Sequence, residues 1–386
     1  MLEKTKAIQP KVQGDLVRAF NENRFPRSVL FAGGRYTGRL TSSLECAKEL
    51  LHVDNLYRNI PNLYLSLSRS YATDLSAKAS LYKKHLTRSS FQNFLDTFFI
   101  VLLSESFASM REEYGVKATK DSDSAGELIN TFNALLDISD SYDDKDRVEP
   151  LIDKVLKLSD KIKPSPVFSI KDVRAFKASS ELHTAEGGAR IYIVEGLENA
   201  SIGAKNAFLK LLEEPPENSY IFILSEVKER LLETILSRLT TFTFLPLPNS
   251  VKNGIIVSYN EDGRKFDSLE DFFLTIGFEE SNTIKTMAKD FACFTLSNKD
   301  LSKAREIALQ FAAKSKEGNA KTPYLLKIFS NEVFIEGKRI LSEREESTYY
   351  LQALLTSLSK AESRVNAYNQ SLRNSLLILL DDLIKL

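Results

Sequence analysis

The feature of the sequence that most constrains its fold is a set of short apolar runs that alternate with segments of helical periodicity. The runs cover residues 28–32, 190–195 and 220–225. Continuous apolar runs of about five residues are typical of strands buried on both faces of a sheet. In residues 41–51 and 199–214 the apolar positions are spaced three and four apart, as in helices. This alternation predicts an α/β fold with a doubly wound, mostly parallel sheet.

Two other parts of the chain have a helical pattern only. Between Asn62 and Glu149 there is no proline, and apolar residues recur at helical spacing, as in residues 91–103. We therefore expect a helical insertion over about 63–165. Beyond Pro248 strand patterns largely vanish, and the rest of the chain is helical in pattern.

The charge balance limits the classes of partner. The chain has 52 Lys and Arg against 52 Asp and Glu, a formal net charge of zero. Binding of a polyanion over a whole surface needs a basic excess, so a stand-alone DNA-binding protein is disfavoured. Lys205, Lys210, Lys228 and Arg230 form at most a local basic face, and ordinary solvated helix faces explain them equally well.

Metal and membrane sites are not indicated by the sequence. The two cysteines, Cys46 and Cys293, are too few for a Cys-rich zinc site, and the three histidines stand in no metal-ligand spacing. We expect neither zinc nor another metal. The first residues lack the apolar segment of a signal peptide, and the apolar run 98–103 is too short to cross a bilayer. We expect a cytoplasmic protein without membrane contacts.

The segment after the first apolar run resembles a phosphate-binding loop that has lost key residues. Such loops follow G-x-x-x-x-G-K-[ST], in which backbone N–H groups and the Lys hold phosphates and the hydroxyl holds Mg²⁺. The candidate loop residues are Gly33, Gly34, Gly38, Arg39, Leu40 and Thr41. Arg39 replaces the Lys. Leu40 has no oxygen to bind Mg²⁺, so this ligand is missing unless a shift of register lets the Thr41 hydroxyl supply it. The other interpretation is a plain strand-to-helix turn.

The end of the second apolar run has also lost the residues expected of an ATPase. In a working ATPase the corresponding strand ends in two acidic residues, of which one orders the metal and the other activates the attacking water. Glu195 stands in the first position and Gly196 in the second, and Glu198 further on is most simply a solvated acid at a helix start. Several losses together predict that the site does not hydrolyse nucleotide. We expect no required cofactor, and ATP binding stays open.

A longer block carries a resemblance to a known family. Residues 206–216, NAFLKLLEEPP, are followed by FILS at 222–225 and ILSR at 235–238, at the distances seen in the clamp-loader branch of the AAA+ family. The resemblance implies an AAA+ domain over 1–248 with an insertion at about 63–165 in place of a zinc module. It further implies a helical lid at 249–295 and an all-helical oligomerisation collar at 296–386.

The resemblance also implies a function. A lost phosphate loop combined with a retained Ser237-Arg238 pair resembles the delta-prime branch of bacterial DNA polymerase III clamp loaders. That branch is a non-hydrolysing stator, and Arg238 would act as an arginine finger in trans at a neighbouring gamma/tau ATPase site. Ser225 matches the polar sensor position. The implied partners are gamma/tau and delta subunits in a hetero-pentamer and, through the complex, the sliding clamp and primer-template DNA.

Alternatives remain for the function and for two single residues. The alternative function is that of a divergent gamma/tau-like ATPase in which Arg39 and Glu195 still function. At the level of single residues, Arg238 is equally typical of a solvated helix end, and Ser225 of a cap on the following helix.

Overall fold

The chain forms two compact units, Met1–Leu269 and Glu270–Leu386, which are described separately. The computed structural model describes residues 1–58, 62–68, 71–113, 122–159, 168–181, 188–259, 266, 268–278, 280–315, 322–342, 347–366 and 370–385. The boundary between the units falls inside the range predicted as a lid, 249–295, and the predicted three-part division stays a prediction.

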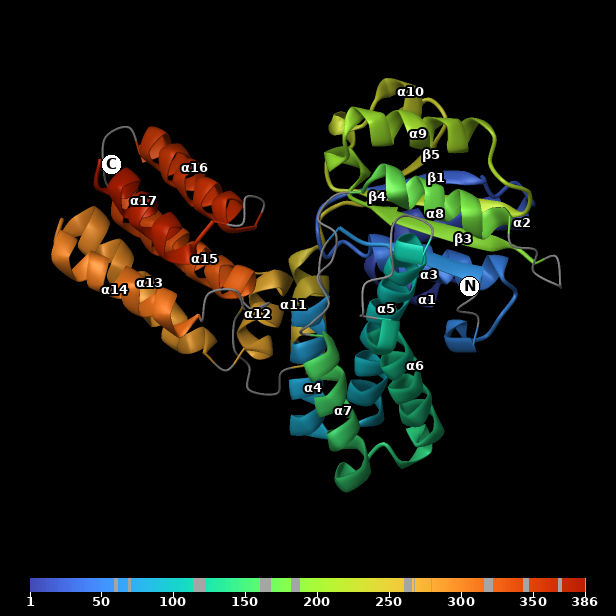
Figure 1. Cartoon of the computed structure of the whole chain (residues 1–386), viewed down its shortest axis with the longest axis horizontal. Helices are drawn as coiled ribbons and strands as arrows, with labels where there is room; N and C mark the ends of the chain where they lie inside the picture. The colour runs from blue at the N-terminus through green and yellow to red at the C-terminus, as the bar shows by residue number, and fades with distance from the viewer. Residues whose placement is uncertain are drawn as a thin grey trace. The chain divides into compact units, whose positions relative to one another are not determined.

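The first unit is built on a five-stranded sheet whose strands pair in parallel throughout (Figure 1). The strands are β1 (Ser28–Ala32), β2 (Leu63–Ser66), β3 (Arg190–Glu195), β4 (Ser219–Ser225) and β5 (Thr240–Thr243), in the order β2-β3-β4-β1-β5. Because parallel strands end at the same edge, the loops after β1, β3 and β4 lie together. The predicted parallel α/β fold is confirmed, and its sheet and helices are consistent with an AAA+ domain.

Helices cover both faces of this sheet, as alternation of side chains along buried strands requires. In β1, Phe31 belongs to the core shared with α2 and α3, whereas Leu30 belongs to the core shared with α8, α9 and α10. Figure 1 shows α9 and α10 on one side of the sheet and α3 on the other. These helices are α1 (Glu3–Ile8), α2 (Pro10–Asn21), α3 (Arg39–Leu50), α8 (Ile170–Glu181), α9 (Ile202–Glu213) and α10 (Glu233–Leu236).

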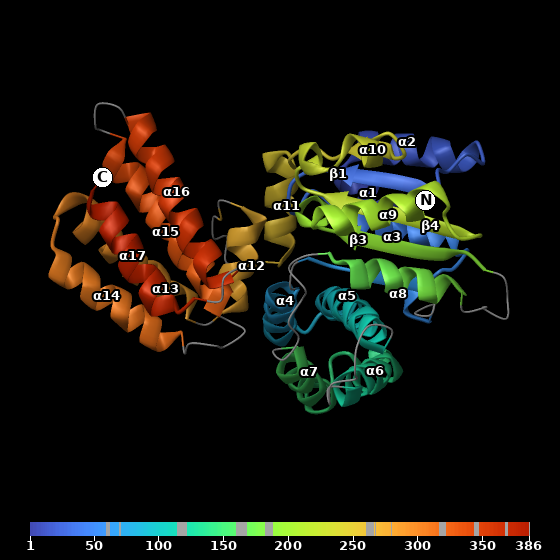
Figure 2. The ribbon, with the colours of Figure 1, turned by 45° about the horizontal axis from the view of Figure 1, so that its top comes forward.

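The predicted insertion starts later than expected. Residues 63–66 are not helical but form the edge strand β2, paired with β3. Four residues are too few for periodicity to separate a strand from a helix, which explains the error. The insertion helices follow as one group (Figure 2): α4 (Ala72–His85), α5 (Arg88–Glu113), α6 (Ser122–Asp137) and α7 (Lys145–Ser159). The predicted end near residue 165 lies outside the described residues.

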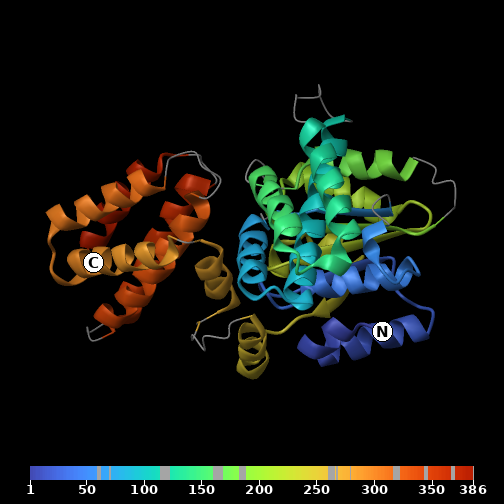
Figure 3. The ribbon, with the colours of Figure 1, turned by 90° about the horizontal axis from the view of Figure 1, so that it is seen from below.

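A polar cluster attaches the insertion to the rest of the first unit, where α5 also packs beside β2 (Figure 3). Asp96 of α5 accepts hydrogen bonds from the Lys4 ammonium at 2.8 Å and from the Tyr57 hydroxyl at 2.5 Å. Burial opposes ionisation of Asp96, but Lys4 and the hydrogen bonds from Lys4, Tyr57 and Gln92 outweigh it, so the pKa of Asp96 lies below its usual range. The ionised carboxylate therefore stabilises this attachment.

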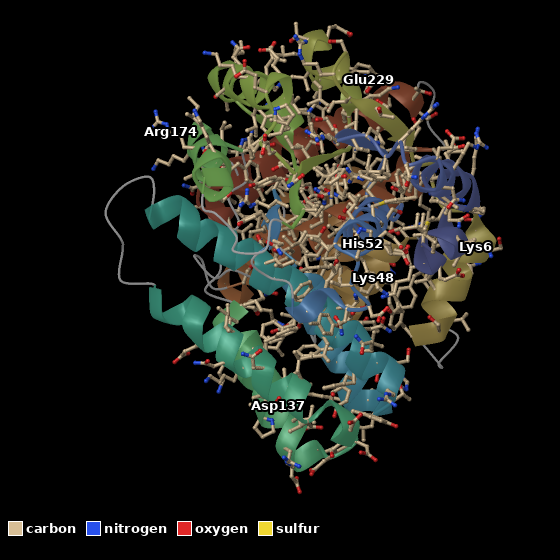
Figure 4. All side chains as sticks on the ribbon, turned by 90° about the vertical axis from the view of Figure 1, so that its right-hand side faces the viewer. Lys6, Lys48, His52, Asp137, Arg174 and Glu229 are labelled. Carbon is tan, nitrogen blue, oxygen red and sulfur yellow. The ribbon has the colours of Figure 1, made fainter. Side chains whose placement is uncertain are left out.

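Asp96→Asn is expected to lower the free energy of unfolding by about 1 kcal/mol at neutral pH, because it removes a charge-assisted pair. A lowered folded-state pKa contributes stability above the unfolded value of about 4, and this stability is lost as pH falls through the folded value. The difference between wild type and variant, measured by urea unfolding, should therefore shrink below about pH 4. Asp137→Asn, at the exposed tip of the insertion (Figure 4), is the control and should change nothing. A pH-independent difference for Asp96→Asn would contradict this account.

The second unit is helical, as predicted. Its core contains Phe291, Phe311 and Phe329, with the last two rings stacked at 4.5 Å between centroids. A Cβ at Gly337 would lie 2.5 Å from Leu354 Cδ2, so this glycine allows α15 and α16 to approach closely. Helix α11 (Asn249–Tyr259) still belongs to the first unit, and the helices that follow it are α12 (Leu269–Gly277), α13 (Ser281–Ala292), α14 (Leu301–Lys314), α15 (Thr322–Leu341), α16 (Ser347–Asn366) and α17 (Leu372–Ile384). In the described part of the chain, no helix has the length and apolar character needed to span a membrane.

Candidate functional site

The candidate phosphate loop begins where β1 ends, between the ends of the neighbouring strands β4 and β5. The Gly33 N–H donates to the Ser225 carbonyl at 3.0 Å, and the Phe244 N–H donates to the Ala32 carbonyl at 2.7 Å. A Cβ on Gly33 would lie 2.5 Å from the Phe244 carbonyl oxygen, whereas a Cβ on Gly34 would meet nothing within 4 Å. Close backbone packing therefore requires glycine at position 33 but not at position 34.

The N-terminal segment packs against the far end of the loop. Gly38, with a φ of 96°, precedes α3, and a Cβ there would lie 2.1 Å from Ile8 Cδ1 at the end of α1. The Gln9 side-chain amide donates to the Thr37 carbonyl at 3.1 Å and to the Leu245 carbonyl at 2.6 Å. Gln9 thus connects the loop to the segment after β5, a contact between distant segments that was not predicted.

The two residues that replace the Lys and the hydroxyl of a working loop have other contacts. Arg39 is the first residue of α3 and is only 6% exposed. Its Nη2 lies 3.7 Å from Glu226 Oε1, and Arg35 Nε lies 2.9 Å from the same oxygen. Leu40 packs against the apolar core beneath the sheet. Thr41 follows it in α3 and is half-buried.

The acidic strand β3 ends in a conformation that excludes a side chain at position 196. Gly196 has a φ of 82°, which L-residues rarely adopt, and a Cβ there would lie 2.4 Å from Ser68 Cβ. The carboxylate that would activate water in an ATPase therefore has no room at this position. Glu195, at the last position of β3, is buried.

Glu198 is not the solvated acid that the sequence led us to expect. It lies in the short 3₁₀ helix η4 (Leu197–Asn199), is 7% exposed, and its Oε1 accepts the Glu226 N–H at 2.9 Å. The donor is the Glu226 N–H after β4, and sequence periodicity contains no information on such a contact. Glu198 therefore ties the ends of β3 and β4 together.

Lys205 is likewise buried rather than part of a basic face. Its Nζ donates to the Glu198 carbonyl at 2.8 Å and to the Arg230 carbonyl at 3.0 Å. Lys210, Lys228 and the Arg230 side chain are exposed, so the predicted local face loses one of its four members.

Lys205→Met is expected to lower the free energy of unfolding by about 2 kcal/mol, because it leaves two carbonyl groups without their ammonium donor. Lys210→Met, on the exposed side of the same helix, is the matched control and should stay within about 0.5 kcal/mol of wild type. Equal unfolding midpoints in urea for the two variants would contradict the buried role of Lys205.

Ser225, the candidate sensor, ends β4 beside the loop. Its side chain is fully buried, and its Oγ makes no hydrogen bond to any residue that the structure describes. The alternative interpretation of Ser225 as a cap on the following helix therefore has no hydrogen bond to support it.

Arg238, the candidate arginine finger, is exposed and held in place by three hydrogen bonds, the longest of them from Nη1 to Ser237 Oγ at 3.4 Å. Its Nη1 donates to the Thr234 carbonyl at 2.8 Å, and its Nη2 donates to Glu213 Oε1 at 2.8 Å. Ser237 Oγ also donates to the Thr234 carbonyl, at 3.1 Å. Glu213 is the first Glu of the EEPP sequence, and its pairing with Arg238 was not predicted. The Arg238 side chain remains 37% exposed and so accessible to a neighbouring molecule.

Comparison with known proteins points to one family for the central part of the chain. Residues 141–248 match the family model described as DNA polymerase III, delta subunit. The chain is 35% identical over 72 residues to the DNA polymerase III subunit delta' of Bacillus subtilis, covering 18% of this chain and 22% of that protein. It is 34% identical over 83 residues to the delta' subunit of Haemophilus influenzae, covering 22% and 24%.

A third relative and a solved structure complete the comparison. The delta' subunit of Pseudomonas aeruginosa is 35% identical over 85 residues, covering 22% of this chain and 25% of that protein. The matched segments thus span about a quarter of the length of these relatives. A gamma subunit-related protein of DNA polymerase III from Thermotoga maritima aligns with a TM-score of 0.29 and 20% identity, over 61% of this chain and 90% of that one.

The matched region contains the acidic strand β3 and the segment from the EEPP sequence to Arg238, but not the candidate phosphate loop. The three relatives carry the same subunit name. These matches confirm the resemblance predicted from the sequence: residues 141–248 match the model of DNA polymerase III delta subunits, and shorter stretches of the chain are similar to subunits named delta'.

Proposed function

We propose that this chain is a non-hydrolysing subunit of a bacterial DNA polymerase III clamp loader, and that it contributes Arg238 to the ATP site of a neighbouring subunit. The observation that carries the proposal is that Arg238, which lies within the matched segment, is both exposed and oriented by hydrogen bonds. The guanidinium is exposed, yet it is oriented by Glu213 and by the Thr234 carbonyl. A preoriented, accessible guanidinium is suited to stabilise charge that develops on a transferring phosphoryl group.

The geometry of the chain's own loop supports the non-hydrolysing part of the proposal. Leu40 contributes to the core and has no ligand atom for Mg²⁺, and Gly196 leaves no space for a water-activating carboxylate. Arg39 faces an internal carboxylate at Glu226. A loop without the metal ligand and the base lacks the groups that make phosphoryl transfer to water fast.

The names of the relatives support the proposed partners. Subunits called delta' belong by name to DNA polymerase III, so the proposed neighbours are gamma/tau and delta subunits in a hetero-pentamer. The sliding clamp and primer-template DNA would be engaged by the whole complex. The proposed oligomerisation collar covers about residues 296–386, within the helical second unit.

The test of this assembly is native mass spectrometry of the full chain mixed with gamma/tau and delta subunits from the same organism. We expect a complex of five subunits that contains one copy of this chain. A chain that remains monomeric in the presence of both partners would overturn the proposed function.

A further inference from the structure

One anionic side chain outside the predicted motifs faces the candidate phosphate loop. Glu226 follows Ser225 directly, at the sheet edge where the strands end. Its Oε1 lies 2.9 Å from Arg35 Nε and 3.7 Å from Arg39 Nη2, so both arginines of the loop face the same oxygen. The Glu226 backbone is held as well, because its N–H donates to Glu198 Oε1.

The burial of Arg39 makes this arrangement more than a surface ion pair. The Arg39 side chain is 6% exposed, whereas the side chains of Arg35 and Glu226 are 47% and 35% exposed. A guanidinium taken out of water needs a compensating anion, since an uncompensated buried charge is strongly destabilising. In a working phosphate loop that anion is the phosphate of the nucleotide. In this chain the carboxylate of Glu226 stands against the residue that replaces the phosphate-binding Lys.

We propose that Glu226 is an internal substitute for a nucleotide's phosphate: its carboxylate occupies the anion site between Arg35 and Arg39 and keeps phosphate-bearing ligands out of the loop. A carboxylate attached to the chain competes at a local concentration that is about millimolar or higher. A free phosphate must displace it before it reaches the arginines. Ser225 Oγ, fully buried and without a hydrogen bond to any described residue, offers one further polar group at this edge.

This inference deepens the non-hydrolysing role proposed above and rests on it. A subunit that acts as a stator must keep its loop folded whether or not nucleotide is present. The Glu226 carboxylate keeps the loop folded without bound nucleotide, because it compensates the charge of Arg39 in every step of the neighbour's ATP cycle.

The test is titration of the full-length chain with inorganic pyrophosphate, without Mg²⁺ and at low ionic strength, followed by calorimetry and by thermal unfolding. Glu226→Gln keeps the size of the side chain and removes its charge. We expect its apparent affinity for pyrophosphate to exceed that of wild type by about tenfold or more. Bound pyrophosphate should also raise the unfolding midpoint of the variant but not that of wild type.

Two further variants assign the effect to the loop. Glu229→Gln makes the same charge change at an exposed site three residues away (Figure 4) and should bind pyrophosphate as wild type does. Adding Arg39→Ala to Glu226→Gln should abolish the gain. If Glu226→Gln folds poorly, pyrophosphate must restore its circular dichroism signal.

Three results would overturn the inference: equal pyrophosphate affinity of Glu226→Gln and wild type, a gain that survives Arg39→Ala, or a poorly folded variant that pyrophosphate does not restore. The assay uses the isolated chain, so its outcome is separate from that of the proposed function. Failure to assemble with gamma/tau and delta would remove the stator role but leave a gain of pyrophosphate binding intact.

Discussion

Replacing Arg238 with alanine in a reconstituted clamp loader is expected to reduce ATP turnover at the adjacent gamma/tau site by about 10³-fold, the lower end of the range for arginine fingers. The reason is that the guanidinium stabilises charge on the γ-phosphate only in the transition state. Loading of the clamp on primed DNA should fall in parallel. The measurement is single-turnover ATP hydrolysis in complexes that differ only in this subunit.

Matched variants separate a finger from a structural arginine. Arg238→Lys keeps the charge but loses the planar fork, and is expected to remain strongly impaired. Glu213→Gln removes the carboxylate that orients Arg238 and should give a smaller defect than Arg238→Ala. Arg174→Ala, at an exposed arginine of α8 (Figure 4), should be indistinguishable from wild type. Unchanged turnover and loading with Arg238→Ala would show that Arg238 has no role in the neighbour's site.

Gly33→Ala is expected to lower the free energy of unfolding by about 3 kcal/mol. The added Cβ would lie 2.5 Å from the Phe244 carbonyl oxygen and 2.8 Å from Phe244 Cβ. Relief requires the backbones of β1 and of the segment after β5 to separate, because no flexible side-chain end can move instead. Urea unfolding of the isolated chain, with the midpoint and slope fitted together, measures the loss.

Gly34→Ala is the matched control for this prediction, since the two glycines are neighbours in the same loop. A Cβ at position 34 meets nothing within 4 Å, and Gly34 is not among the described glycines with positive φ. We expect Gly34→Ala to be neutral or to stabilise by up to about 1 kcal/mol, through the unfolded chain. Equal losses for the two variants would refute the close approach at Gly33.

Long or strongly apolar strands were predictable from the sequence, and short ones were not. The runs that became β1, β3 and β4 are buried on both faces, so their composition alone marks them. The edge strand β5, Thr240–Thr243, has mostly exposed side chains and therefore no apolar run to detect.

The residues of the candidate site that lie in a motif were predictable from the sequence. The residues whose role depends on contacts between distant segments were not. The loop glycines and Arg238 stand at fixed spacings within recognisable sequence patterns. Glu213 belongs to the EEPP sequence and Glu226 directly follows the FILS sequence, but both acquire their roles from partners on another element. Single-sequence patterns record periodicity along one element, and they contain no information on which charges meet across a fold.

The central claim is that this chain completes a neighbour's ATP site and does not hydrolyse ATP at a site of its own. The most direct measurement is Mg²⁺-dependent ATP hydrolysis by the isolated chain, beside hydrolysis by gamma/tau and delta with and without it. We predict no turnover by the isolated chain and a rise in turnover when it joins its partners. Hydrolysis by the isolated chain that Arg39→Ala abolishes, with no rise on assembly, would contradict the claim and establish a divergent ATPase.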